Sequence, residues 1–256
     1  MKIRSITLGF LAAFFTVTAV SAANSAGTPS APAPVRALLI TGGCCHDYKL
    51  QANALVEGMK KFGDVTWTVV NEGGSTTRGQ IKLYDDPDWA KAYDVVVHNE
   101  CFADTDDPVY IRKITAAHKA GKPAVVIHCA MHSYRAATFD DWRELLGVTS
   151  RRHDHQSNYP VKTVVKDHPA LRDLPAAWTT PKDELYVIEK VWPTTKALAT
   201  SVSELDGKEY PVIWTSDYHG ARVFGTTFGH SNATWQDPVF LALVSRGVLW
   251  AAGREK

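Results

Sequence analysis

The sequence has no strong excess of charge of either sign. Its formal net charge is +1, and this becomes −1 once residues 1–34 are set aside, because they hold Lys2 and Arg4 but no acidic residue. A near-neutral surface argues against nucleic acid or an anionic membrane as the main partner. We therefore expect no nucleic-acid partner and no membrane partner.

Several well-known motifs are also missing. The sequence contains no Walker loop, no GxGxxG fingerprint and no GxSxG elbow, so we expect no nucleotide cofactor and no serine-hydrolase site of that kind. The HExxH signature of many zinc enzymes is absent too. No internal repeat is visible, which argues against a solenoid or propeller.

Long hydrophobic runs are scarce, and the clearest one is at the start of the chain. Lys2 and Arg4 precede an apolar stretch over residues 6–20, which ends in small residues around Ala22. This pattern predicts a secretory signal peptide over residues 1–23. The Ala/Pro/Ser-rich residues 24–34 predict a flexible linker, followed by a single domain over residues 35–256. We expect a secreted protein, located in a bacterial periplasm.

The rest of the chain alternates strand-like and helix-like segments. Short apolar runs predict strands over 35–41, 65–70, 94–99 and 124–127, and apolar residues at helical spacing predict helices over 50–62, 108–120 and 139–146. Residues 71–92 lack a periodic pattern and predict a long loop. Five further strand-like segments and a final helix over 239–252 follow. This order predicts an α/β sandwich with a mostly parallel central sheet, helices on both faces and additional later strands.

Histidine follows four of the predicted strands. His46, His98, His128 and His230 each lie at or just beyond a carboxyl end, where open α/β sheets bind their ligands. A single histidine is more often structural, and we assign His118, on a helix, to that class. Four at equivalent strand ends predict a histidine-rich cleft.

Other histidines and carboxylates can complete such a cleft. His128 and His132 are four residues apart, which suits a pair of metal ligands on one helical face. His153 and His155 form an HxH pair in a predicted loop, which is either part of a metal site or a solvated polar segment. Asp183 and Glu184 begin a predicted strand and can supply a carboxylate.

The four cysteines leave two interpretations open. An exported protein meets an oxidising compartment, where disulfides form, or the cysteines are small buried apolar residues. Cys44 and Cys45 are adjacent, so we expect either of them to pair with Cys101 or Cys129 rather than with each other. We do not expect Cys129 to act as a nucleophile, although it follows a strand between histidines.

The chain resembles the ThuA-like (trehalose utilisation) family across most of residues 35–253. The stretches that carry the resemblance are LLITGGCCHDY (38–48), YDVVVHNE (93–100), GKPAVVIHCAMHSYR (121–135), ELLGV (144–148), DHPALRDLP (167–175), DELYVIE (183–189), PVIWTSDYHGARVFGTTFGHSNATWQDP (211–238) and RGVLWAAG (246–253). The resemblance implies a flavodoxin-like fold of the class I glutamine amidotransferase-like superfamily and a role in sugar utilisation. It places His128 where the amidotransferases carry their nucleophilic cysteine, so we expect no glutaminase activity.

The resemblance also implies a set of site residues. The polar pattern of the family falls here on His46, Asn99, His128, His132, Glu184, His230 and Trp235, and on either His153 or His155. From these we predict a lyase or hydrolase that acts on keto-sugars or glycosides and uses a divalent metal, zinc or manganese. His46, His128, His230 and the 153/155 pair are the expected metal ligands. His46, His128, His132, Glu184 and Asn99 are the expected catalytic residues.

Substrate contacts and alternatives complete the prediction. Tyr48, Tyr134, Trp235 and Glu100 are expected to contact a small sugar, although core packing is the commoner role of tryptophan. An exported, non-catalytic carbohydrate-binding protein is the main alternative, and a redox protein using the four cysteines is a third. A homo-oligomer is compatible with the sequence.

Overall fold

The computed structural model describes residue 1, residues 32–172 and residues 174–255. The predicted signal peptide and most of the predicted linker lie outside these residues. Residues 33–255 form one compact unit, built around a nine-stranded sheet in the order β2-β1-β3-β4-β11-β10-β9-β6-β7, with a separate two-stranded sheet of β5 and β8.

One half of the large sheet is parallel. It contains β1 (Val35–Gly43), β2 (Val65–Asn71), β3 (Val95–Cys101), β4 (Ala124–Ile127) and β11 (Ala221–Thr226). The runs that form β1, β3 and β4 are buried on both faces, as near-continuous apolar strands of parallel sheets usually are. Their carboxyl ends therefore meet at one edge of the sheet.

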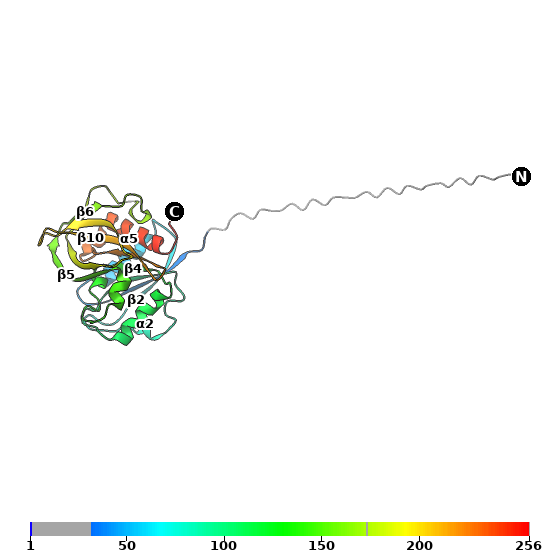
Figure 1. Ribbon diagram of the computed structural model, residues 1–256, viewed down its shortest axis with the longest axis horizontal. Helices are drawn as coiled ribbons and strands as arrows, with labels where there is room; N and C mark the ends of the chain where they lie inside the picture. The colour runs from blue at the N-terminus through cyan, green and yellow to red at the C-terminus, as the bar shows by residue number, and fades with distance from the viewer. Residues whose placement is uncertain (2–31, 173, 256) are drawn as a thin grey trace. The chain divides into compact units, whose positions relative to one another are not determined.

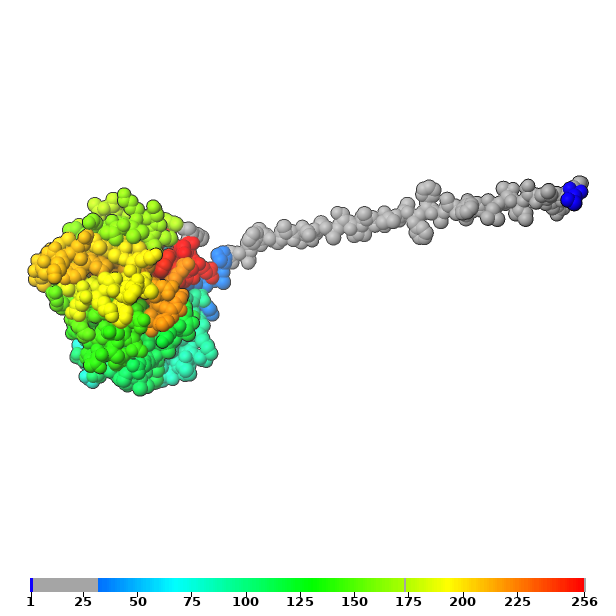
Figure 2. Space-filling view, in the orientation of Figure 1, coloured from blue at the N-terminus to red at the C-terminus, as the bar shows by residue number. Residues whose placement is uncertain are grey.

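The other half is antiparallel and comes from the later part of the chain. It contains β10 (Glu209–Tyr218), β9 (Lys196–Val202), β6 (Pro160–Thr163) and β7 (Trp178–Thr179). The small sheet pairs β5 (Val148–Ser157) with β8 (Asp183–Val191). In Figure 2 this later segment, coloured light green to golden yellow, covers the upper part of the surface, above the darker green of residues 100–145.

Helices cover both faces of the large sheet. α1 (Tyr48–Met59) and α5 (Pro238–Ala251) pack on one face, against Val125 and Ile127 of β4. α2 (Pro108–Lys119) and α3 (Asp141–Leu146) pack on the other, where Ala124 and Val126 point. This alternation follows from the period of two along a strand, and β4 lies between α5 and α2 in Figure 1. The remaining helices are short: η1 (Lys82–Asp85), η2 (His128–Met131), η3 (Pro169–Leu171) and α4 (Asn232–Gln236).

The structure confirms the predicted α/β class, with parallel strands first and antiparallel strands later. One local prediction was wrong. Residues 153–155 belong to strand β5 rather than a loop, because pairing with β8 overrides a local sequence rich in charge and histidine. The segment 71–92 is mostly without regular structure, as expected, and contains the short 3₁₀ turn η1. Within the described residues, no helix has the length and apolarity needed to cross a membrane.

Candidate functional site

Three histidines from three strand ends meet at the carboxyl edge of the parallel sheet. His46 lies in the loop after β1, His128 directly follows β4, and His230 follows β11. One ring nitrogen from each lies within 4.8 Å of the other two. His46 Nε2 is 3.2 Å from His230 Nδ1. The strand-end prediction therefore holds for these three residues.

The backbone at His128 turns sharply to present its ring. His128, the first residue of η2, adopts φ +47°, in the left-handed region. Non-glycine residues usually adopt this conformation only where the surroundings enforce it. Its Nδ1–H donates to the carbonyl of Thr227 at 2.7 Å. That bond fixes the tautomer and leaves the Nε2 lone pair available, 3.3 Å from the Tyr186 hydroxyl.

The β5–β8 sheet supplies a carboxylate beside the histidines. Oε2 of Glu184 lies 3.3 Å from His230 Nδ1, 3.6 Å from His153 Nδ1 and 3.7 Å from His128 Nε2. Glu184 is only 7% exposed, so its charge acts at short range on these rings. His153 is therefore the member of the HxH pair near the site. The ring of His155 instead contacts exposed Glu204.

Buried hydrogen bonds hold the loop that carries His230. The carboxylate of Asp183 accepts bonds from the backbone amides of Gly229 and His230 at 3.0 and 3.2 Å, and from the Thr234 hydroxyl. The Gly229 carbonyl accepts from the Gln51 amide and the Trp235 indole at 3.3 and 2.8 Å. The His230 backbone is therefore fixed from several directions.

His46, His153, Glu184 and His230 line a cavity of about 190 Å³, and His128 is buried behind them. Tyr186 forms part of its wall, with its ring stacked on His132 at a centroid distance of 3.9 Å. His132 also bonds Ser150 through Nε2, at 3.1 Å. The lining residues are Cys44, Cys45, His46, Thr77, Cys101, Ala103, Cys129, His132, Arg135, His153, Glu184, Tyr186 and His230.

Burial favours the neutral form of four of the site histidines by lowering their pKa values. It lowers the pKa of His46 to about 4, with the charge of His230 adding to the effect. Burial and the nearby Arg135 lower the pKa of His132 to about 3, and burial also lowers the pKa values of His128 and His230. Neutral imidazole is the form that binds a metal or accepts a proton.

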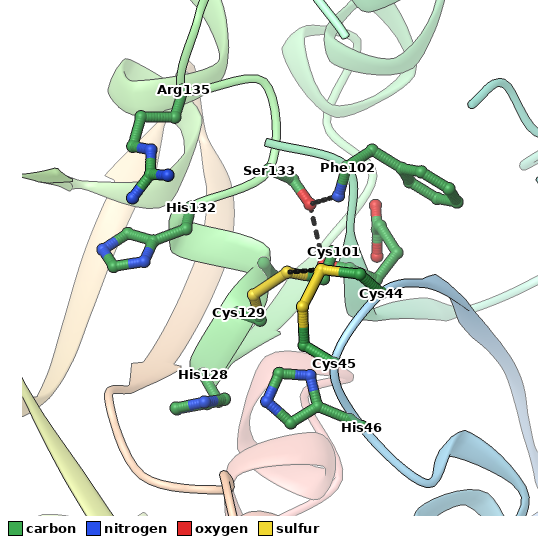
Figure 3. The surroundings of a disulfide bond; sticks show 12 residues. Cys44, Cys45, His46, Cys101, Phe102, His128, Cys129, His132, Ser133 and Arg135 are labelled. Atoms are coloured by element: carbon green, nitrogen blue, oxygen red, sulfur yellow. Dashed lines mark hydrogen bonds between the residues drawn. A yellow bond between two sulfur atoms is a disulfide. The ribbon is translucent and has the colours of Figure 1, made fainter. Parts of the chain in front are cut away.

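The four cysteines pair differently from the expectation. Cys44 bonds to its neighbour Cys45, and Cys101 bonds to Cys129, so the prediction that Cys44 and Cys45 do not pair was wrong. The left-handed backbone of Cys45, at φ +84°, accompanies the bond between neighbours. Figure 3 shows the sulfur atoms gathered beside the rings of His46 and His128.

Two predicted site residues on β3 point away from the cavity. His98 and Glu100 face α2, where the His98 ring bonds Glu100 at 2.9 Å and His118 at 3.0 Å. All three are fully buried. Because side chains alternate along a strand, Asn99 faces α1 instead and donates to Gln51 at 2.9 Å. The expectation that His98 joins the other strand-end histidines was therefore wrong.

Three predicted aromatic contacts serve the scaffold. Trp235 and Tyr134 are fully buried in the two cores, and neither lines the cavity. Tyr48 is buried beneath the His46 loop, where its hydroxyl donates to the Cys44 carbonyl at 2.9 Å and lies 3.3 Å from His46 Nδ1. Asn99, Tyr48 and Trp235 thus support the loops that hold His46 and His230.

Sequence reasoning missed several residues that the fold brings to the site. Tyr186 and Gln156 come from the β5–β8 sheet, and Gln156 Nε2 lies 2.7 Å from His230 Nε2. Arg135 and Thr77 line the cavity. The signal for Tyr186 was its position two residues after Glu184, on the same face of a predicted strand. Thr77 lies in a segment without periodicity and gave no signal.

Comparisons with known proteins agree with this fold. A putative ThuA-like protein from Parabacteroides merdae is 23% identical, with a TM-score of 0.71 over 86% of this chain and 90% of that chain. One from Bacteroides uniformis is 15% identical, with a TM-score of 0.67 over 90% and 97%. A cytoplasmic protein from Salmonella typhimurium is 12% identical, with a TM-score of 0.58 over 84% and 98%. No curated protein shows significant similarity to the sequence.

The fold is α/β, of the flavodoxin-like and glutamine amidotransferase-like kind, with its polar groups at the carboxyl edge of the sheet. The family model for trehalose utilisation, ThuA, matches residues 36–251. The chain therefore belongs to the ThuA family, which is implicated in carbohydrate metabolism.

Proposed function

We propose that this protein is a metal-assisted lyase or hydrolase acting on a keto-sugar or a related glycoside. The observation that carries the proposal is the convergence of His46, His128 and His230 beside Glu184, next to a cavity that all of these except His128 line. Three imidazoles and a carboxylate are a donor set typical of zinc and manganese sites. The sugar class comes from the family, and the small cavity is consistent with a single sugar ring.

The donor set fits a divalent cation. His128 presents Nε2 because Thr227 holds its Nδ1–H, and His46 presents Nε2 because its other nitrogen faces the Tyr48 hydroxyl. His230 presents Nδ1 once the Gln156 amide turns its oxygen toward Nε2–H. Glu184 lies within reach as a further ligand or as a base. When bound, such a cation polarises a carbonyl oxygen and stabilises negative charge that develops on it.

The remaining chemistry is proton transfer. A keto group acidifies the neighbouring C–H bond, so a base that removes this proton allows the glycosidic oxygen to leave. Glu184 and His153, whose side chains lie 3.6 Å apart, are placed to take and return a proton. Arg135 at the rim offers hydrogen bonds to sugar hydroxyl groups, and the Tyr186 ring forms a wall against the apolar face of a sugar.

The test combines metal analysis with turnover. We expect protein purified without chelators to contain zinc or manganese, and chromatography to show cleavage of a 3-keto-disaccharide such as 3-keto-trehalose. Full activity after EDTA treatment, with no metal detected beforehand, would contradict the metal assignment. Tight calorimetric binding of a sugar without turnover would replace the proposal by the carbohydrate-binding alternative.

A further inference from the structure

Three neighbouring strands bring all four cysteines to one place beside the histidines. Cys44 and Cys45 follow β1, Cys101 ends β3, and Cys129 lies in η2 after β4. The Sγ atoms of Cys44 and Cys101 are 3.8 Å apart, although they belong to different disulfides. In Figure 3 the two disulfides lie against each other, with the His46 ring nearby.

Close backbone approach makes this cluster possible. A Cβ atom on Gly43 would lie 2.1 Å from the Cys101 carbonyl oxygen, and Gly43 has φ +88°. Only glycine fits there. The Cys44 amide then donates to the same carbonyl at 3.2 Å. The sulfur positions are thus set by the sheet rather than by flexible loops.

We propose that reduction of the two disulfides turns these sulfurs and His46 into a binding site for a soft cation, Cu(I) in particular. The donor atoms of Cys44, Cys45 and Cys101 lie within 4.8 Å of one another, and so do those of His46, Cys101 and Cys129. Neither group contains a carboxylate. Thiolate-rich sites of this kind select Cu(I) and zinc over magnesium, calcium or manganese.

The reduction requires two equivalents of an external dithiol. One thiolate of the dithiol attacks the exposed Cys45 sulfur, which breaks the Cys44–Cys45 bond and releases the Cys44 thiolate. The second thiol resolves the mixed disulfide, so the dithiol leaves as a disulfide and Cys45 as a thiol. The Cys44 thiolate then attacks Cys101, 3.8 Å away. This step forms a Cys44–Cys101 bond and frees the Cys129 thiolate.

A second dithiol reduces the Cys44–Cys101 bond in the same way. The exposed pair thereby gives access to the Cys101–Cys129 pair, whose residues are only 3% and 6% exposed. The cation displaces the thiol protons when it binds. The site does not depend on the proposed sugar chemistry, although it shares His46 with the three-histidine centre.

The test is a Cu(I) titration of the full chain, with and without prior anaerobic reduction by dithiothreitol. After the reductant is removed, Cu(I) is added in competition with a chromophoric chelator. We expect reduced protein to take up Cu(I) at least 100-fold more tightly than unreduced protein, with ultraviolet absorption characteristic of copper–thiolate bonds. The Cys101→Ser variant, which removes the cysteine common to both groups, should lose that gain.

Matched variants separate this site from the histidine centre. His128→Gln should keep the reduction-dependent uptake, because His128 is in neither cysteine group. Cys129→Ser removes only one group, and it serves as a second cysteine variant if Cys101→Ser fails to fold by circular dichroism. Equal Cu(I) affinity before and after reduction, or copper uptake without thiolate absorption, would overturn the proposal.

Discussion

The molecule holds one cluster of buried histidines and one of buried and half-buried histidines, and the two differ in what their ring nitrogens face. His98 and His118 lie in the core under α2, where the nitrogens contact Glu100, each other and the Lys122 carbonyl. His46, His128 and His230 lie at the sheet edge, where one nitrogen of each converges on the others. Burial lowers pKa values in both clusters. The comparison teaches that burial alone does not point to a binding site, and that the convergence of ring nitrogens is the feature on which the proposed site is based.

The largest expected effect is a difference in metal affinity between a variant of the edge cluster and a matched variant of the core cluster. His128→Gln removes a converging nitrogen, and we expect at least a 100-fold loss of zinc or manganese affinity together with the sugar-cleaving activity. His118→Gln, the matched variant in the core, should keep its affinity within about twofold. Isothermal titration and elemental analysis measure both. Equal losses in the two variants would remove the distinction between the clusters.

A smaller loss of metal affinity is expected when the hydrogen bonds that hold the His230 loop are weakened. Asp183→Asn keeps the side-chain shape but leaves one oxygen to serve the four donors that now bond the carboxylate. The His230 loop should loosen, and metal affinity should fall about 10- to 100-fold, as is usual for residues that orient metal ligands. Asp217→Asn is the control, because Asp217 accepts only one exposed hydrogen bond of this kind, from the backbone amide of Gly220. This variant should leave the metal affinity unchanged. Unaltered affinity in Asp183→Asn would show that the loop is held without the carboxylate.

The smallest effect concerns acid stability, which both clusters share. The pKa of His118 is lowered to about 3, first by burial and then by His98. Its unfolded-state pKa is about 6.5, so between pH 6.5 and 3 the unfolded chain binds the extra proton. The stability that comes from a neutral His118 is therefore complete above pH 6.5 and is lost progressively as the pH falls through this window.

Urea unfolding of metal-free protein at several pH values measures this slope. His118→Gln should be less stable than wild type near pH 7, because it breaks the buried pair, but its stability should decline less steeply on acidification. Asp183 has the opposite effect on the pH dependence of stability. Burial raises its pKa to about 6, so protonation of its carboxyl group as the pH falls through this value favours the folded state. An identical pH slope in wild type and His118→Gln would contradict the assignment of a neutral, buried His118.

The sequence allowed the sheet edge to be predicted but not the direction of every side chain there. His46, His128 and His230 follow apolar runs, and the rule that the carboxyl ends of parallel strands meet at one edge of the sheet located them correctly. His98 also follows such a run, yet it lies within β3, where alternation directs it to the opposite face from Asn99. Strand ends were uncertain by one or two residues, and one residue reverses the side that a side chain faces.

The residues that the β5–β8 sheet brings to the candidate site were harder to predict, for a different reason. Glu184 and His153 meet only because two strands pair across an irregular register, with shifts between Ser150 and Arg152 and between His153 and Gln156. Local propensity carries no information about such shifts. The bond between Cys44 and Cys45 likewise depends on a left-handed backbone at Cys45, which no neighbouring residue indicated.

Strand β11 has a consequence for how the protein folds. It is the last strand in the chain, yet it lies between β4 and β10, with Val223 paired to Ala124. Contacts between residues so distant in sequence form slowly, because a long loop must close first. His230 lies four residues after the end of this strand, so we expect the three-histidine centre to be assembled late in folding. Uptake of the proposed metal would therefore report completion of the native topology, and we expect a chain shortened before β11 to contain His46 and His128 but to capture no ion.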